Sequence, residues 1–179
     1  MAASFRSLCT CIAGIRRTRG SNAKIKLCAA YLNELESTDD VRLAAQFIGE
    51  GAFSAISDRK ASIGSRTAGL AASSFCEIDY DVVFKPCRTA TGSNSETIGR
   101  LMENVPAAVN KRKPQVITLK DAENWFVRLS EVSSRDDKAR ILHEMWERMT
   151  TDEIVYSIRM MGQGSLRIGF ETRSLVSAI

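Results

Sequence analysis

The sequence has few of the residues from which metal and catalytic sites are built. Its 179 residues include one histidine, His143, and five cysteines that form no Cys-x-x-Cys pair. A zinc site needs several such ligands at short spacings, so a zinc protein is excluded. No nucleophile, base and metal-ligand set converges in the sequence, which argues against a self-contained enzyme. An odd number of cysteines without such pairs is typical of a reduced cytosolic protein.

Long apolar runs are also missing. No uncharged apolar run approaches the roughly 18 residues that a membrane-spanning helix needs, so we expect no membrane association. Proline is rare, and all three prolines lie in one stretch, between positions 86 and 114. The composition that remains, with 44% apolar and 26% charged residues, is that of an ordinary globular protein.

Acidic residues are absent from the first 33 positions, which hold six arginines and lysines. An arginine-rich, acid-poor N-terminus is typical of a mitochondrial transit peptide. The alternative is that this segment is the first helix of a folded unit, and the internal repeat described next favours the helix. The net charge of +4 permits an anionic partner without requiring one.

Two stretches of the chain resemble each other. Residues 21–51 align with residues 134–164, which places Lys24 on Lys138. A Gly-x-Gly triplet closes both stretches, and an Ile-Gly-x-x-Thr-x-x-Leu pattern follows at positions 63 and 168. We interpret this similarity as an internal duplication.

The duplication predicts the domain organisation. We expect a single all-α domain in which residues 3–75 form the first repeat, 76–117 a linker and 118–179 the second repeat. Upstream of the aligned stretches, Phe5–Ile15 is matched with Ala122–Val132. Each repeat would hold three helices and a last short helix, and a pseudo-twofold axis would relate the two repeats.

The helix signals are clearest in the second repeat. Capping-box patterns at Thr118–Asp121 and Thr150–Glu153 predict two helix starts. In the linker the sequence predicts one helix, over residues 96–104. No strand pattern of comparable strength is present, so the predicted fold class is all-α.

Glycines cluster after the third helix of each repeat. Gly49 and Gly162 suit helix C-caps, where glycine often adopts the left-handed conformation. A second glycine follows a basic residue in each loop and leads into the next helix: Gly64 after Arg59-Lys60, and Gly169 after Arg167. Free N–H groups and the dipole at a helix start favour an anion such as a phosphate.

Two functional interpretations follow from these loops. Two phosphate sites about a twofold axis would match the two backbones of a nucleic-acid duplex and would not read its bases. Alternatively, the repeats form a helical protein-interaction scaffold without DNA binding, and the loops only turn corners. The residues alone leave both interpretations open.

A duplicated all-α unit that ends in Ser-Leu-Arg-Ile-Gly-x-x-x-x-Ser-Leu, over Ser165–Leu175, resembles the N-terminal DNA-binding domain of ATP-dependent DNA ligases. The resemblance implies sequence-independent binding of nicked duplex DNA through backbone phosphates, in DNA repair, replication or recombination. Its implied partners are nicked double-stranded DNA and the catalytic domain of its own parent protein; a monomer is the default expectation. The resemblance also implies a cytoplasmic, nucleoid-associated protein in bacteria or archaea, or a nuclear protein in eukaryotes.

The chemistry of the parent enzyme is expected to lie outside this chain. ATP and Mg²⁺ are the cofactors that the resemblance implies for the parent, and a Lys-x-Asp-Gly lysine would accept the adenylate. Lys120-Asp-Ala-Glu123 does not match that signature, so we expect no catalytic residue, metal or cofactor here. We interpret the chain as a fragment that stops before the catalytic domain.

The resemblance also implies which residues contact phosphates. In the second repeat they belong to the Gly-x-Leu-Arg-Ile-Gly stretch, and in the first repeat to the matching loop, with one lysine from each second helix behind them. The predicted DNA-phosphate-binding residues are Gly164, Ser165, Arg167, Gly169, Arg59, Lys60, Ser62, Gly64, Lys24 and Lys138.

Overall fold

The computed structural model describes residues 2–162, 166, 170 and 172–179. These residues form eleven α-helices and one π-helical turn, which confirms the all-α class. Among the described residues, Ser4 and Thr118 form an isolated antiparallel β-bridge. Within the same residues, no helix combines the length and the apolar character needed to cross a bilayer.

The first repeat contains four helices, α1 (Phe5–Arg17), α2 (Ser21–Asn33), α3 (Thr38–Gly49) and α4 (Ser65–Cys76). The side chain of Ser4 caps α1 by accepting the N–H of Ser7. One face of α1 is fully buried, and this confirms that the arginine-rich N-terminal segment is a core helix: Phe5, Leu8, Ile12 and Ile15.

The linker is more helical than the sequence predicted. It contains a π-helical turn, η1 (Tyr80–Phe84), followed by α5 (Lys85–Thr91), α6 (Asn94–Asn104) and α7 (Pro106–Lys111). The prediction of a single helix, over residues 96–104, was wrong, because α5 and α7 flank it and both begin at or next to a proline. Pro86 and Pro106 both lie in the first turn of a helix, where a missing N–H costs no intrahelical hydrogen bond.

The second repeat contains α8 (Leu119–Glu131), α9 (Arg135–Arg148), α10 (Thr151–Met161) and α11 (Thr172–Ala178). Both predicted capping boxes are present, each with the two reciprocal hydrogen bonds. The N-caps of α1 and α8 lie 114 positions apart, whereas Phe5–Ile15 and Ala122–Val132 were aligned at a spacing of 117. Three residues are nearly one helical turn, so apolar periodicity alone fits either spacing.

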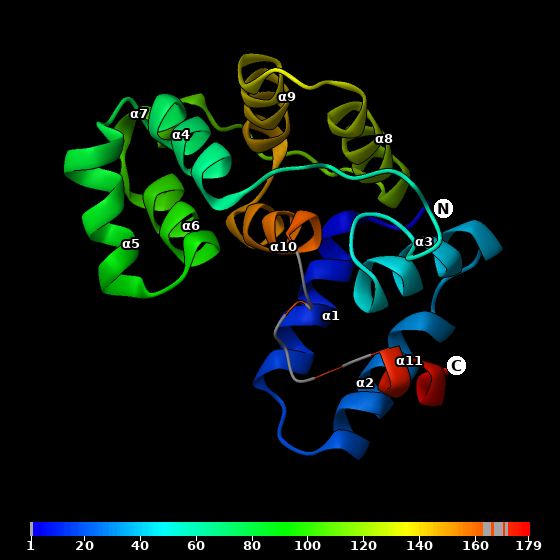
Figure 1. The fold of residues 1–179 in the computed structure, drawn as a ribbon. Helices are drawn as coiled ribbons and strands as arrows, with labels where there is room; N and C mark the ends of the chain where they lie inside the picture. The colour runs from blue at the N-terminus through cyan, green and yellow to red at the C-terminus, as the bar shows by residue number, and fades with distance from the viewer. Residues whose placement is uncertain (1, 163–165, 167–169, 171) are drawn as a thin grey trace.

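Helices of each half of the chain pack on helices of the other half. Helix α1 packs on α10 and α3 packs on α8, while α4 packs on α9 and α11 packs on α2. Figure 1 shows α10 at the centre of the molecule, with α4 to α7 on one side and α3 on the other. Such reciprocal packing is what a duplicated unit would produce, but the pseudo-twofold relation and the repeat boundaries stay predictions.

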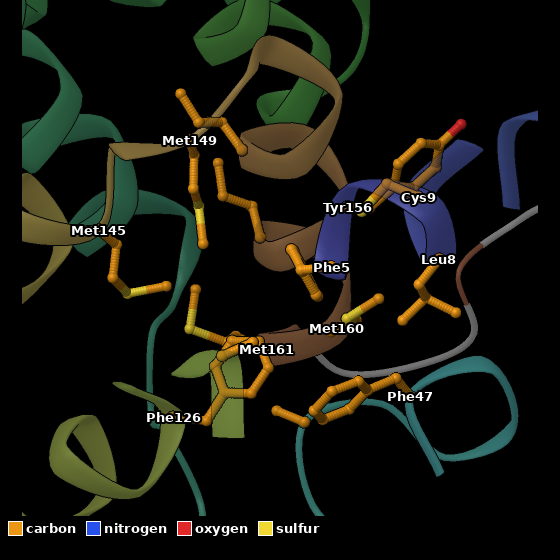
Figure 2. Close-up of a cluster of buried hydrophobic side chains, with 14 of the residues drawn as sticks. Phe5, Leu8, Cys9, Phe47, Phe126, Met145, Met149, Tyr156, Met160 and Met161 are labelled. Carbon is orange, nitrogen blue, oxygen red and sulfur yellow. The ribbon is translucent and has the colours of Figure 1, made fainter. Parts of the chain in front are cut away.

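One hydrophobic core joins both halves (Figure 2). Phe47 from α3 contacts Phe5 from α1 and Phe126 from α8 in edge-to-face geometry, with ring centroids 6.2 and 5.6 Å apart. Met160 and Met161, at the end of α10, are buried in the same cluster. The core therefore fixes the point from which the glycine-bearing loop of the second repeat leaves.

Candidate nucleic-acid interface

A groove of about 920 Å³ lies where the two halves meet. The loop between α3 and α4 forms one side of it, and the C-terminal end of α10 forms another. The N-terminal ends of α4 and α6 also open onto it. The residues that line this groove and carry charge are Arg16, Glu50, Arg59, Lys60, Arg88, Glu96 and Arg159.

The loop of the first repeat is fastened to the end of α10. Gly51 has φ +92°, and a Cβ atom at this position would lie 2.6 Å from the carbonyl oxygen of Met160. The next residue, Ala52, donates its N–H to the same oxygen at 2.9 Å. Only glycine both adopts this positive φ readily and leaves room for the Met160 oxygen. This contact places the start of the first loop beside Gly162, where the second loop begins.

The predicted cations of the first loop lie on the wall of the groove. The guanidinium of Arg59 donates to Ser130 Oγ at 3.0 Å and lies 3.4 Å from the Glu131 carboxylate, both in the last turn of α8. Arg59 and Glu131 are both about half exposed, so their ion pair is weak and a phosphate can compete for Arg59. Lys60 is exposed and lines the groove.

Lys138 has a different position from the one the sequence predicted. Its side chain is buried, and its amine donates to the carbonyl oxygens of Ala61 at 2.7 Å and Ser62 at 3.2 Å. Burial lowers the pKa of this amine. A direct phosphate contact would require both hydrogen bonds to break, so Lys138 is suited to shaping the loop that carries Arg59 and Lys60.

The end of the first loop leads into the N-terminus of α4. Ser62 has φ +53°, a conformation that residues other than glycine seldom adopt, and its carbonyl is one of the two that accept from Lys138. Gly64 is the N-cap of α4 and supplies no side-chain acceptor to the first turn. The first N–H groups of a helix have no intrahelical partner, so this end of α4 suits an anion.

The other described residue of the prediction does not line the groove. Lys24 is in the second turn of α2 and is half-buried, and it is not among the described residues that line the groove. The second-repeat residues of the prediction, Gly164, Ser165, Arg167 and Gly169, lie outside the described residues. Their described neighbours Leu166 and Phe170 are buried.

Sequence reasoning missed the contribution of the linker and of α1. The N-terminus of α6 opens onto the groove, and Arg16 from α1 and Arg88 from α5 join its wall. The Ser-x-x-Glu pattern at Ser93–Glu96 was the one available signal, because it marks a helix start. The arginines could not be found, since they come from distant parts of the chain.

Arg159 connects the groove to the second loop. Its guanidinium donates to Ser95 Oγ at 3.0 Å and to the carbonyl oxygen of Leu166 at 3.4 Å. It also lies 3.6 Å from the Glu96 carboxylate, which Arg16 binds at 2.9 Å. The pKa of Glu96 is lowered mainly by its hydrogen bond to Arg16, so this carboxylate stays charged at neutral pH.

The electrostatic balance of the groove is positive. Among the described residues that line it, five are basic and two are acidic. Because Glu96 is paired with Arg16 and Arg159, the other charged side chains of the groove are Arg59, Lys60 and Arg88 against Glu50. A basic groove at two helix N-termini can bind phosphate groups.

A family model described as DNA ligase N terminus matches residues 4–179. No curated protein matches the chain.

Proposed function

This chain belongs to the DNA ligase N-terminus family, the N-terminal domains of ATP-dependent DNA ligases, and from this membership we propose that its groove binds duplex DNA. In this proposal the groove contacts backbone phosphates and holds a nicked duplex, whatever its sequence, for strand joining. Repair, replication and recombination are the processes that such a role would serve.

The observation that carries the proposal is the convergence of basic side chains with the N-terminus of α4. Lys60 and Arg88 come from separate elements, yet both line the groove into which the first turn of α4 opens. Charged donors and backbone N–H groups together suit phosphate oxygens. Phosphate contacts position a protein on a duplex and carry no sequence information directly.

The catalytic step is assigned to the parent protein. The chain lacks the Lys-x-Asp-Gly signature, so the residues present do not fit an adenylate-accepting site. We therefore place ATP, Mg²⁺ and bond formation in a separate catalytic domain, with which this domain would act as a partner on the same DNA. As a single unit it would bind DNA as a monomer.

Fluorescence anisotropy with labelled duplexes tests the proposal. Nicked and intact duplexes of two unrelated sequences would be titrated with the wild-type chain and with an Arg59→Ala/Lys60→Ala variant. We expect similar affinity for the two sequences and weaker binding by the variant. The control is Arg42→Ala, because Arg42 is half-exposed on α3, away from the groove.

Three outcomes would contradict the proposal. Binding that differs strongly between the two sequences would indicate base readout. No measurable binding near physiological salt would instead support the helical interaction scaffold. Equal losses in the Arg59→Ala/Lys60→Ala and Arg42→Ala variants would show that the groove is not the contact surface.

A further inference from the structure

We propose that a second surface, made by Arg66, Tyr80 and Lys85 and named here the tyrosine strip, extends the phosphate contacts beyond the groove. The proposal rests on the proposed function, because its ligand is the backbone of the duplex held in the groove. The strip lies on the linker side of the molecule, where η1 packs against α4 and α5 packs against η1 and α6.

Tyr80 is fixed in place by close packing. Its ring stacks on Phe84 with centroids 5.4 Å apart and an interplanar angle of 14°, and Phe84 is fully buried. Both rings lie against α4 at Gly69, where a Cβ atom would lie 2.7 Å from Phe84 and 2.9 Å from Tyr80. The glycine thus lets the two rings pack directly on the helix and gives Tyr80 a defined position.

Tyr80 in turn holds two cations. The guanidinium of Arg66 and the amine of Lys85 each lie 5.5 Å from the centroid of its ring, within the range of cation–π attraction. Arg66 and Lys85 are exposed. A rigid ring that orders two solvent-exposed cations lowers the entropy that these flexible side chains would lose on binding a phosphate.

Two of the helices that contribute to the strip, α4 and α5, also contribute to the groove. Ser65, directly before Arg66, lines the groove, and so does Arg88, three residues after Lys85 in α5. A duplex carries a negative charge about every 1.7 Å along its axis, so a backbone that leaves the groove meets the strip next. The strip therefore suits the same ligand as the groove.

The carboxylate of Asp81 competes with a phosphate for Lys85 of the strip. Asp81 lies 2.8 Å from the Lys85 amine, and both side chains are largely exposed. A hydrogen bond from Lys85 is the main cause of the lowered pKa of Asp81, with a smaller contribution from Arg66. Asp79 is occupied as the cap of η1, where it accepts the N–H of Val82 at 2.8 Å. Because exposed ion pairs are weak, a phosphate can displace Asp81 from Lys85.

The salt dependence of duplex binding tests the strip. An Arg66→Ala/Lys85→Ala variant loses two phosphate contacts, and each contact contributes about 0.9 to the slope of log affinity against log salt. We expect that slope to become shallower by about two units. Asp81→Asn should bind more tightly than wild type, since it frees Lys85 and removes a negative charge.

A matched ion pair on the far side of the molecule provides the control. Arg42 and Asp39 on α3 are also 2.8 Å apart and exposed to a similar degree, and Figure 1 shows α3 and α5 on opposite sides. The variants Arg42→Ala and Asp39→Asn should leave the slope and the affinity near the wild-type values. Circular dichroism would verify that every variant keeps its helical content.

The outcomes separate the strip from the groove. The strip would be overturned if the Arg66→Ala/Lys85→Ala variant kept the wild-type salt slope while Lys60→Ala lost affinity for the duplex. That result would leave the proposed function intact. If Asp81→Asn and Asp39→Asn raised the affinity for the duplex equally, the effect would come from the overall charge, and the strip would also be overturned. If the wild-type chain binds no duplex, the proposed function fails and the strip fails with it.

Discussion

Replacing Lys138 with methionine should destabilise the protein and weaken DNA binding without removing a phosphate contact. Methionine keeps most of the apolar stem of lysine but removes the amine that donates to Ala61 and Ser62. A buried carbonyl that loses its donor costs about 1–3 kcal/mol. The second bond, at 3.2 Å, is the longer one, and removing a buried charge offsets part of the loss. We therefore expect a net loss of about 2 kcal/mol of unfolding free energy.

Thermal unfolding and salt titration measure the two consequences. For a chain of this size, about 2 kcal/mol corresponds to a Tm lower by about 4–8 °C. The affinity for duplex should fall because the loop that carries Lys60 loses its shape, while the salt slope should stay at the wild-type value. Lys120→Met is the control, since Lys120 is exposed on α8 and should change neither quantity.

The opposite pattern would refute this reasoning. If Lys138→Met left Tm unchanged and made the salt slope shallower by about 0.9, its amine would be a direct phosphate ligand, as the sequence first predicted. The hydrogen bonds to Ala61 and Ser62 would then not describe the DNA-bound protein.

Three further predictions concern buried contacts. Burial raises the pKa of Glu153. The contribution of Glu153 to stability is therefore present below its ordinary pKa and is lost as pH rises through the raised value. The free energy of unfolding in urea should depend less on pH between 4 and 7 for Glu153→Gln than for wild type. Gly51→Ala should cost about 1–3 kcal/mol by thermal unfolding, because alanine is strained at φ +92° and its Cβ would clash with Met160, and an unchanged Tm would contradict this. Arg159→Met should weaken duplex binding by releasing the carbonyl of Leu166, whereas wild-type affinity would show that this contact does not position the second loop.

The elements that could be predicted from the sequence have local causes. The capping boxes at Thr118 and Thr150 depend on residues three apart, and both are present as predicted. The buried face of α1 has apolar residues at helical spacing, and the match of this segment to the second repeat is why the arginine-rich N-terminus could be assigned to a helix. The family could be predicted as well, because the Ser165–Leu175 pattern is distinctive and local.

The features that could not be predicted depend on tertiary contacts. Lys138 aligns with Lys24 in the repeat, yet Lys138 is buried against a carbonyl of Ala61, and no sequence signal distinguishes the two lysines. The groove depends on arginines from α1, α5 and α10 that meet only in the folded chain. The packing of Tyr80 on α4 could not be predicted either, because it depends on Gly69 of another helix.

The salt dependence of duplex binding tests the central claim most directly. Anisotropy titrations of a nicked duplex at several salt concentrations would compare wild type with Lys60→Ala and Arg167→Ala. The phosphate-binding account predicts steep loss of affinity with salt in wild type and a slope shallower by about 0.9 in each variant. A flat salt response in wild type, or variant slopes equal to that of wild type, would contradict it.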